Sequence, residues 1–192
     1  MRLDPDSLLQ AYSQGAFPMA DHDGKLHWYT ANPRGILPLD QFHIPQTLRQ
    51  LIRQKKFEIR INHNFQAAMR ACMSNRIDNT WINEKLIAAF VRLHELGYAH
   101  SVEAWQNNQL AGGLYGVSLG GAFFGESMFH HQRDASKVAL AALVERLNER
   151  GYELLDTQTC TQHLKRFGVI EIPEEDYLAR LAKAMQLKCR FD

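Results

Sequence analysis

Two carboxylates in otherwise apolar surroundings are the residues best placed to do chemistry in this chain. Glu126 ends a long uncharged run within residues 112–128, and Asp156 follows about thirty residues later in the sequence Leu-Leu-Asp156-Thr-Gln158. Burying a carboxylate without a cationic partner is costly. The two positions therefore predict a pocket that receives a positively charged group.

Asp156 and Gln158 are candidates for joint action. They lie two residues apart on a predicted strand, so their side chains are expected on the same face. The alternative is a strand-end aspartate that caps the following turn. For Glu126 the alternative is a salt bridge to a nearby Lys or Arg, and the residues alone leave both alternatives open.

Trp81 and a stripe of basic residues are candidates for contacts to nucleic acid. Trp81 precedes a predicted helix, and a flat aromatic side chain in a loop can stack on an unpaired base for about 1–3 kcal/mol. Arg49, Arg53 and Lys56, at i, i+4 and i+7, form one stripe on a predicted helix that can contact phosphates. The alternatives are a core tryptophan and an ordinary solvated helix face.

An apolar pocket beside these polar groups is a further candidate feature. For each of its residues ordinary core packing is the alternative. Phe123 also differs in strand parity from Glu126, so either a bulge intervenes or only one of them faces the pocket. We select Phe123 and Leu143 as lining residues. The full candidate set is Leu114, Phe123, Leu140, Leu143 and Leu155.

The composition describes a folded protein rather than a general coat for nucleic acid. The chain has 192 residues, 45% of them hydrophobic, and 22 basic residues against 21 acidic ones give a net charge of +1. General phosphate binding normally brings a strong basic excess, whereas a local basic patch fits this balance. We expect one domain, or one domain with a small appendage.

Targeting, membrane and metal signals are absent from the sequence. The N-terminus lacks the apolar segment of a secretory signal, and polar and small residues interrupt the uncharged run over 104–125. The three cysteines are widely separated, and the pairs His130-His131 and His22/His27 lack partners at metal-ligand spacing. We therefore expect a soluble, cytoplasmic protein that binds no metal.

Periodicity and turn residues predict strands that alternate with helices. Strands are expected over 57–61, 100–105 and 152–157, with two more that end at Val117 and Met128 and flank the turn Leu119-Gly120-Gly121. Helices are expected over 45–54, from an Asn62–Asn64 cap to about Met73, over 84–96 and 134–150, and after Pro173 with Tyr177, Leu178, Leu181 and Met185 inside.

This order of elements predicts a fold class. Three successive strands, a helix and another strand form an antiparallel meander that ends in one parallel crossover. That is the skeleton of the α+β acetyltransferase-like (GNAT-like) fold, a mixed sheet with flanking helices. The first residues are rich in aromatic and turn residues and lack clear periodicity. We therefore place a small N-terminal lobe at 1–32 and the acetyltransferase-like catalytic domain at 33–192.

Motifs along nearly the whole chain carry a family resemblance. They are Ala11-Tyr12-x-x-Gly15-x-Phe17-Pro18, Pro33-Arg34-Gly35-Ile36-Leu37, Thr80-Trp81-Ile82, Leu93-His94-Glu95-x-Gly97-x-Ala99-His100-Ser101-Val102-Glu103, Gly112-Gly113-x-Tyr115-Gly116-Val117, Gly125-Glu126-Ser127-Met128-Phe129, Ala135-Ser136-Lys137 and Asp156-x-Gln158. In this order and at this spacing the chain resembles the bacterial leucyl/phenylalanyl-tRNA–protein transferases, from about residue 8 to residue 180.

The resemblance implies an activity and its partners. Members of this family move leucine or phenylalanine from aminoacyl-tRNA to the N-terminal Arg or Lys of a protein, which marks that protein for degradation through the N-degron route. Methionine is a further candidate for the transferred residue. The resemblance also implies the acetyltransferase-like fold behind a small N-terminal domain. We expect no cofactor, and we expect a monomer.

The resemblance also implies roles for the candidate residues. Asp156 and Gln158 become a relay that orients the incoming α-amine and moves its proton, because aminolysis of an ester needs a neutral, aimed amine. Glu126 contacts the α-ammonium of the aminoacyl group. Trp81 and Met19 hold the terminal adenosine of the tRNA. The remaining assignments are Phe123 and Leu143 to the leucine or phenylalanine side chain, and Arg49, Arg53 and Lys56 to the acceptor stem.

Three departures from the family pattern bear on tRNA affinity and acceptor preference. Met19 stands where an aromatic residue is usual. The sequence Arg-Phe-Gly-Val at 166–169 replaces the usual Ser-Leu-Gly-Ala, and Glu174 stands where a basic residue is expected.

Two other functions compete with this one. A coenzyme-A-dependent acetyltransferase of the same fold would cradle pyrophosphate with a glycine-rich turn at a helix start. Residues 132–137 of this chain, Gln-Arg-Asp-Ala-Ser-Lys, contain no glycine and include an acidic residue, which argues against coenzyme A. A non-catalytic binder of basic N-termini would need Glu126 and Asp156 but neither Gln158 nor Trp81.

Overall fold

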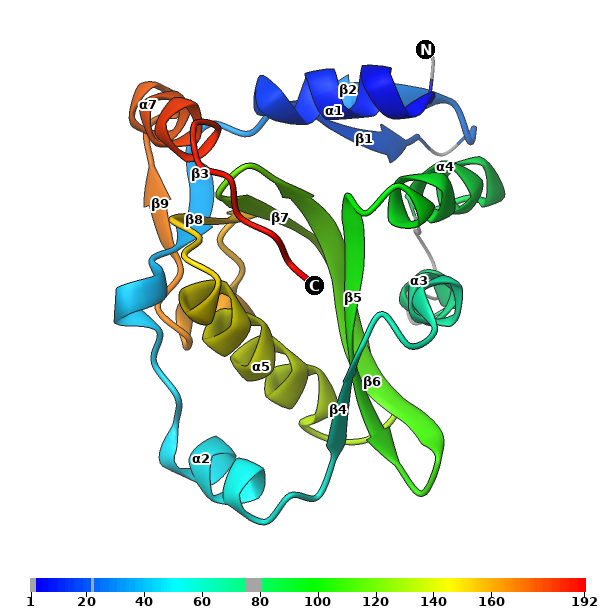
Figure 1. Ribbon diagram of the computed structural model, residues 1–192, viewed down its shortest axis with the longest axis vertical. Helices are drawn as coiled ribbons and strands as arrows, with labels where there is room; N and C mark the ends of the chain where they lie inside the picture. The colour runs from blue at the N-terminus through cyan, green and yellow to red at the C-terminus, as the bar shows by residue number, and fades with distance from the viewer. Residues whose placement is uncertain (1–2, 22, 75–80) are drawn as a thin grey trace.

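A seven-stranded mixed sheet forms the centre of the molecule (Figure 1). The computed structural model describes residues 3–21, 23–74 and 81–192. In sheet order the strands are β4 (Glu58–Ile61), β5 (Ala99–Gln106), β6 (Gln109–Leu119), β7 (Ala122–His130), β8 (Leu154–Gln158), β3 (Arg34–Leu37) and β9 (Ile170–Ile172).

The strand directions confirm the predicted fold class. Strands β4 to β7 pair antiparallel, and β7 pairs parallel with β8 after a crossover through helix α5 (Ala135–Glu149). Strand β3 then pairs antiparallel with both β8 and β9. The sequence did not predict β3 and β9, because β3 is buried on both faces and does not alternate, and the three residues of β9 are too few to show a pattern.

Helices cover both faces of the sheet and enclose two hydrophobic clusters. On one face lie α1 (Pro5–Ser13), α3 (Phe65–Ser74), α4 (Glu84–Glu95) and α7 (Glu174–Ala184), whose buried side chains pack with Phe124 and Tyr115. On the other face lie α5 and α2 (Gln46–Arg53), which pack with Phe123 and Leu155. The short helices η1 (Leu39–Gln41) and α6 (Gln162–Lys165) lie in connecting segments.

The N-terminal segment is more regular than predicted. Helix α1 begins after Asp4, whose carboxylate accepts a hydrogen bond from the Ser7 amide, and it buries Leu8 and Tyr12. Two short strands, β1 (Phe17–Ala20) and β2 (Leu26–Tyr29), then form a separate two-stranded sheet. We expected no clear periodicity in this segment, and for α1 that expectation was wrong. Its apolar residues Leu8 and Tyr12, spaced i, i+4, mark the buried face of the helix.

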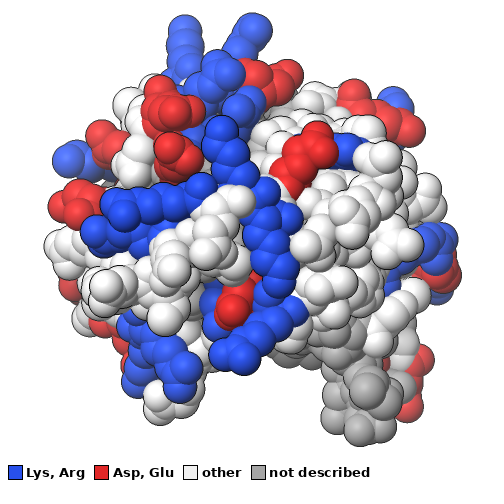
Figure 2. All heavy atoms as spheres, turned by 90° about the horizontal axis from the view of Figure 1, so that it is seen from below, with Lys and Arg blue, Asp and Glu red and all other residues white. Residues whose placement is uncertain are grey.

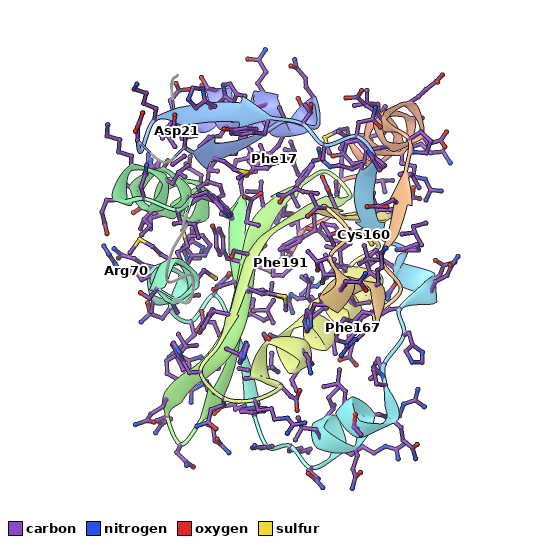
Figure 3. The ribbon with its side chains drawn as sticks, turned by 180° about the vertical axis from the view of Figure 1, so that it is seen from behind. Phe17, Asp21, Arg70, Cys160, Phe167 and Phe191 are labelled. Atoms are coloured by element: carbon purple, nitrogen blue, oxygen red, sulfur yellow. The ribbon has the colours of Figure 1, made fainter. Side chains whose placement is uncertain are left out.

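The C-terminal segment crosses one sheet face and ends beside α5 (Figure 1). Phe191 is 1% exposed and lies in the middle of the molecule (Figure 3). Its ring stacks on Phe123 at 5.1 Å and on His100 at 4.4 Å between ring centroids, and burial lowers the pKa of His100 to about 4. Leu178 of α7, predicted inside, is 41% exposed, so that prediction was wrong.

Phe191→Ala should lower the free energy of unfolding by about 3–5 kcal/mol, because it leaves a cavity between Phe123 and His100. Leu178→Ala is the matched control, and its exposed side chain should contribute within about 0.5 kcal/mol. Urea denaturation followed by circular dichroism measures both values. Equal, small losses in the two variants would mean that the C-terminal segment does not belong to the core.

Candidate active site

A buried ion pair between Arg34 of β3 and Asp156 of β8 lies beneath the site. The Arg34 Nε and Nη2 atoms donate to Asp156 Oδ1 and Oδ2 at 2.9 and 2.6 Å, in the bidentate arrangement that fits a carboxylate. The two residues are 1% and 0% exposed. Asp156 therefore already has its cation, supplied by the protein itself.

Other groups complete the surroundings of this pair. Tyr177 donates its hydroxyl hydrogen bond to Asp156 Oδ2 at 2.7 Å, and the Gln158 amide donates to Asp156 Oδ1 at 2.8 Å. Arg34 also donates to the Gly15 carbonyl oxygen at 2.8 Å, and its guanidinium lies over the rings of Phe17 and Tyr177. Burial opposes the charge of Arg34, but the hydrogen bonds and charge of Asp156 outweigh it and raise the arginine pKa.

Two β-bulges lie where β7 and β8 separate. Their parallel pairing ends at Phe124 and Asp156. On β7, Glu126 is the extra residue between two pairs with β6, and on β8 Thr157 is the extra residue between two pairs with β3. Bulges redirect side chains at such points. They aim Glu126 and Gln158 at one another across the gap, where Gln158 Nε2 donates to Glu126 Oε1 at 3.0 Å.

A close approach of two chain segments depends on Gly35, which pairs with Gln158 next to the bulge. A Cβ atom at Gly35 would lie 2.6 Å from the carbonyl carbon of Thr159, closer than real contacts allow. The loop after β8 can therefore fold back over β3 only because this residue is glycine. This packing requirement accounts for the glycine that follows Arg34 in the motif Pro33-Arg34-Gly35-Ile36-Leu37.

Glu126 is a nearly buried carboxylate with one oxygen left for a ligand. Its Oε1 accepts hydrogen bonds from the Tyr12 hydroxyl at 2.8 Å and from Gln158, and within the described residues its Oε2 accepts none. Burial raises the pKa of Glu126 to about 8, with a smaller contribution from the charge of Asp156. Burial and the charge of Glu126 likewise raise the pKa of Tyr12.

An apolar cavity of about 420 Å³ opens above Glu126 and Gln158. Met19 and Trp81 lie together at it, and the Ala20 amide donates to the Trp81 carbonyl oxygen at 3.2 Å, which ties β1 to this loop. The other lining residues are Phe17, Leu114, Tyr115, Gly125, Ser127, Met128, Leu140, Leu143, Leu155, Thr157, Thr159, Thr161, His163 and Leu164.

The structure brings most of the predicted site residues together. Glu126, Gln158, Met19, Trp81 and Leu143 all line the cavity. Of the two alternatives that the parity of Phe123 and Glu126 left open, a bulge is present between them, and only Glu126 faces the cavity. Two expectations about placement were wrong. Phe123 is fully buried behind the lining, against Phe191, and Asp156 does not share the exposed face of Gln158, because the bulge and the positive φ of Gln158 break the alternation.

The basic stripe is only partly as predicted. Arg49 and Arg53 are exposed on α2. Lys56 lies beyond the end of that helix, after a left-handed residue at Lys55, and its ammonium lies 5.2 Å from the centre of the Phe57 ring. It therefore does not continue the stripe on the same helix.

Sequence reasoning assigned no role to three residues that hold the site together: Arg34, Tyr12 and Tyr177. Arg34 and Tyr12 stood in quoted motifs, and a lone arginine beside a required glycine was the available signal for a buried partner. The pairings themselves span 122 and 114 residues of sequence, which periodicity cannot detect.

Two negative findings apply to the described part of the chain. No group of three or more His, Cys, Asp or Glu side chains in residues 3–21, 23–74 and 81–192 is arranged to hold a metal ion. Across the same residues, each helix is too short or too polar to cross a membrane. His22 of the histidine pairs and Thr80 of the tryptophan motif lie outside the described residues.

Comparison with known proteins gives consistent matches over the whole chain. A family model described as leucyl/phenylalanyl-tRNA protein transferase matches residues 36–182, and one for the N-terminal domain of that family matches residues 1–32. Leucyl/phenylalanyl-tRNA–protein transferases from Gloeobacter violaceus and Rubrobacter xylanophilus are 51% and 50% identical. These matches cover 98% and 100% of this chain, and 97% and 100% of the relatives.

Solved structures show the fold alone. The structure of L-PGS from Bacillus licheniformis matches with a TM-score of 0.50 at 8% identity. The match covers 97% of this chain, which spans only 63% of that protein's length. A conserved protein of unknown function from Staphylococcus epidermidis also matches with a TM-score of 0.50, at 9% identity, over 90% of this chain and 66% of its own.

Glu126→Gln should change how stability depends on pH. The unfolded carboxyl ionises near pH 4.5, whereas the folded one holds its proton until about pH 8, so wild-type stability falls as the pH rises through this window. Glu126→Gln lacks this loss and should gain stability relative to wild type between pH 5 and 8.5. Urea unfolding at several pH values measures the difference, with the exposed Glu145→Gln as the control variant. A constant difference for Glu126→Gln would contradict the raised pKa.

Proposed function

The chain belongs to the leucyl/phenylalanyl-tRNA–protein transferase family, and on that premise we propose that it transfers leucine or phenylalanine from aminoacyl-tRNA to a protein N-terminus. The observation that carries this proposal is an apolar cavity that ends at a carboxylate, Glu126, which forms no ion pair with any residue in the described part of the chain. Glu126 has one oxygen open to a ligand, while Asp156 is neutralised by Arg34. A free α-ammonium beside an apolar side chain fits this combination.

The donor residue fits the cavity in one orientation. The leucine or phenylalanine side chain lies among Leu114, Leu140 and Leu143, and its α-ammonium meets Glu126 Oε2. Below pH 8 this binding releases the proton of Glu126, because an adjacent cation lowers the pKa that burial had raised. The terminal adenosine lies between Trp81 and Met19, where Met19 contributes a polarizable but non-aromatic surface.

The transfer step is aminolysis of an ester. The neutral α-amine of the acceptor attacks the ester carbonyl, the new amide bond forms, and the ribose hydroxyl leaves with a proton. Gln158 lines the cavity and orients the amine through its side-chain oxygen, while its NH₂ group is held by Glu126. This positioning raises the transfer rate, because the amine and the ester carbonyl are already held in a reactive geometry when the reaction begins.

Asp156 takes a positioning role in this account rather than the proton-relay role expected from the sequence. Both of its oxygens already accept two hydrogen bonds each, from Arg34, Tyr177 and the Gln158 amide. The side chain is buried and lies outside the cavity lining, so its oxygens face protein groups rather than the substrate. It fixes the backbone of Gln158 from behind the cavity.

We take the domain division, the acceptor, the tRNA contacts and the location of this protein from the resemblance to its family. We place a small N-terminal lobe at 1–32 and the catalytic domain at 33–192, with acceptors that begin with Arg or Lys and become N-degron substrates. Arg49, Arg53 and Lys56 contact the tRNA backbone. The protein acts as a cytoplasmic monomer without a cofactor.

A transfer assay tests the proposal. Radiolabelled leucyl-tRNA and a peptide that begins with arginine should give labelled peptide without coenzyme A, while the N-acetylated peptide should stay unlabelled. Peptide modification that requires acetyl-coenzyme A would instead identify an acetyltransferase. Peptide binding without transfer would identify a non-catalytic binder of basic N-termini.

Trp81→Ala should raise KM for aminoacyl-tRNA by about five- to 150-fold, the equivalent of about 1–3 kcal/mol of lost base stacking. The matched control is Trp28→Ala, since Trp28 is 37% exposed on β2 and lies outside the cavity lining. Steady-state kinetics on one charged tRNA give both values. Equal KM for Trp81→Ala and wild type would mean that the adenosine is bound elsewhere.

A further inference from the structure

A second hollow continues from the active-site cavity along the start of helix α5. It encloses about 540 Å³ and shares Met128 and His163 with that cavity. A smaller hollow of about 240 Å³ adjoins it through Asp134, Lys137 and His163 and adds Arg166. We call these two hollows the basic groove; its polar residues are Thr47, His130, Arg133, Asp134, Ser136, Lys137, His163 and Arg166.

The charge of the basic groove is predominantly positive. Asp134 is its acidic member among the lining residues, and it accepts from Lys137 Nζ at 2.5 Å and lies 3.5 Å from Arg133 Nε. These neighbours, together with Lys56, lower the pKa of Asp134. Burial and the charges of Lys137, Arg166 and His130 lower the pKa of His163. The groove thus has three cationic side chains, Arg133, Lys137 and Arg166, and one carboxylate, Asp134.

The wider surface continues this charge. Lys and Arg side chains gather, with a few acidic ones among them, on the face of the molecule seen from below in Figure 2, the end at which α2 lies in Figure 1. A polyanion that entered the groove would therefore meet positive charge before it reached the active-site cavity.

Ser136 is the feature of the groove that internal packing does not explain. The residue is 5% exposed and lines the groove, yet within the described residues its hydroxyl has no hydrogen-bond partner. It is the second residue of α5, a helix of 15 residues, and so lies at the positive end of the helix dipole. Its oxygen is not one of the enclosed polar atoms that lack a partner in the described part of the chain, so it is accessible from the groove and can bind a ligand there.

We propose that the basic groove is a phosphate subsite for the RNA donor, in which Ser136 and Lys137 bind a backbone phosphate of the nucleotides that precede the terminal adenosine. The inference rests on the proposed function, because it takes the active-site cavity to hold the aminoacyl-adenosine end. The strand that leads to that end must leave the cavity, and the groove is a continuous, positively charged exit. Phosphate contacts of this kind fix the register of a strand without reading its sequence.

Two donors separate the subsite from the rest of the active site. Phenylalanyl-adenosine carries no phosphate, whereas phenylalanyl-CCA carries the phosphates that precede the adenosine. Wild type should show a higher kcat/KM on phenylalanyl-CCA. Lys137→Gln should lower the ratio of the two kcat/KM values roughly tenfold, near the lower end of the scale for hydrogen bonds to a charged group. Ser136→Ala should lower it about threefold, on the scale of an ordinary net hydrogen bond.

Lys85→Gln, on the exposed side of α4, is the matched control and should keep the wild-type ratio. Equal losses on both donors, or an unchanged ratio in Lys137→Gln and Ser136→Ala, would overturn the subsite. Equilibrium binding of uncharged CCA against adenosine provides a second readout, in which Lys137→Gln should also flatten the salt dependence.

The same pair of measurements separates failure of the subsite from failure of the proposed function. If wild type transfers phenylalanine from both donors but the variants keep its ratio, only the subsite is wrong. If wild type transfers from neither donor, yet binds CCA more tightly than adenosine and loses this preference in Lys137→Gln, the groove binds RNA and the transferase function is wrong.

Discussion

The buried ion pair between Arg34 and Asp156 is the constraint on which the rest of the site depends. Taking both charges out of water is costly, and only bidentate geometry with every remaining acceptor position filled offsets the cost. The donors that fill those positions come from α7, through Tyr177, and from the Gln158 backbone. Arg34 also holds the Gly15 carbonyl oxygen. One interaction thereby joins the N-terminal segment, β3, β8 and α7 at the floor of the cavity.

The second carboxylate, Glu126, differs from Asp156 in its hydrogen-bond partners. Glu126 is also nearly buried, and burial raises its pKa to about 8, because the hydrogen bonds from the neutral groups of Tyr12 and Gln158 offset this rise only in part. The fold thus satisfies one acid internally and leaves the other with an open oxygen. Two adjacent bulges produce this difference, because they redirect Glu126 and Gln158 into the gap between strands that would otherwise stay paired.

Local sequence patterns predicted the elements better than their contacts. The meander, the α5 crossover and the isolation of Glu126 follow from alternation, helical spacing and charge, all of which act within a few residues. The expected pocket for a positive group stays a prediction for Glu126, and it does not hold for Asp156, which pairs with Arg34, 122 positions away in the sequence. Phe123 and Asp156 were misplaced because bulges and the C-terminal Phe191 are set by long-range packing, which a single strand pattern does not contain.

The central claim is that Asp156 acts by holding Gln158 in place and exchanges no proton with the substrate. The most direct test is the single-turnover transfer rate of wild type and Asp156→Asn from pH 5.5 to 9, with near-ultraviolet circular dichroism to confirm the fold. A positioning role predicts a rate lower by roughly 10²-fold at every pH, the scale of a misplaced reactive group, with the shape of the profile preserved. A profile that loses or shifts its pH dependence would contradict the claim and make Asp156 a proton acceptor in the reaction.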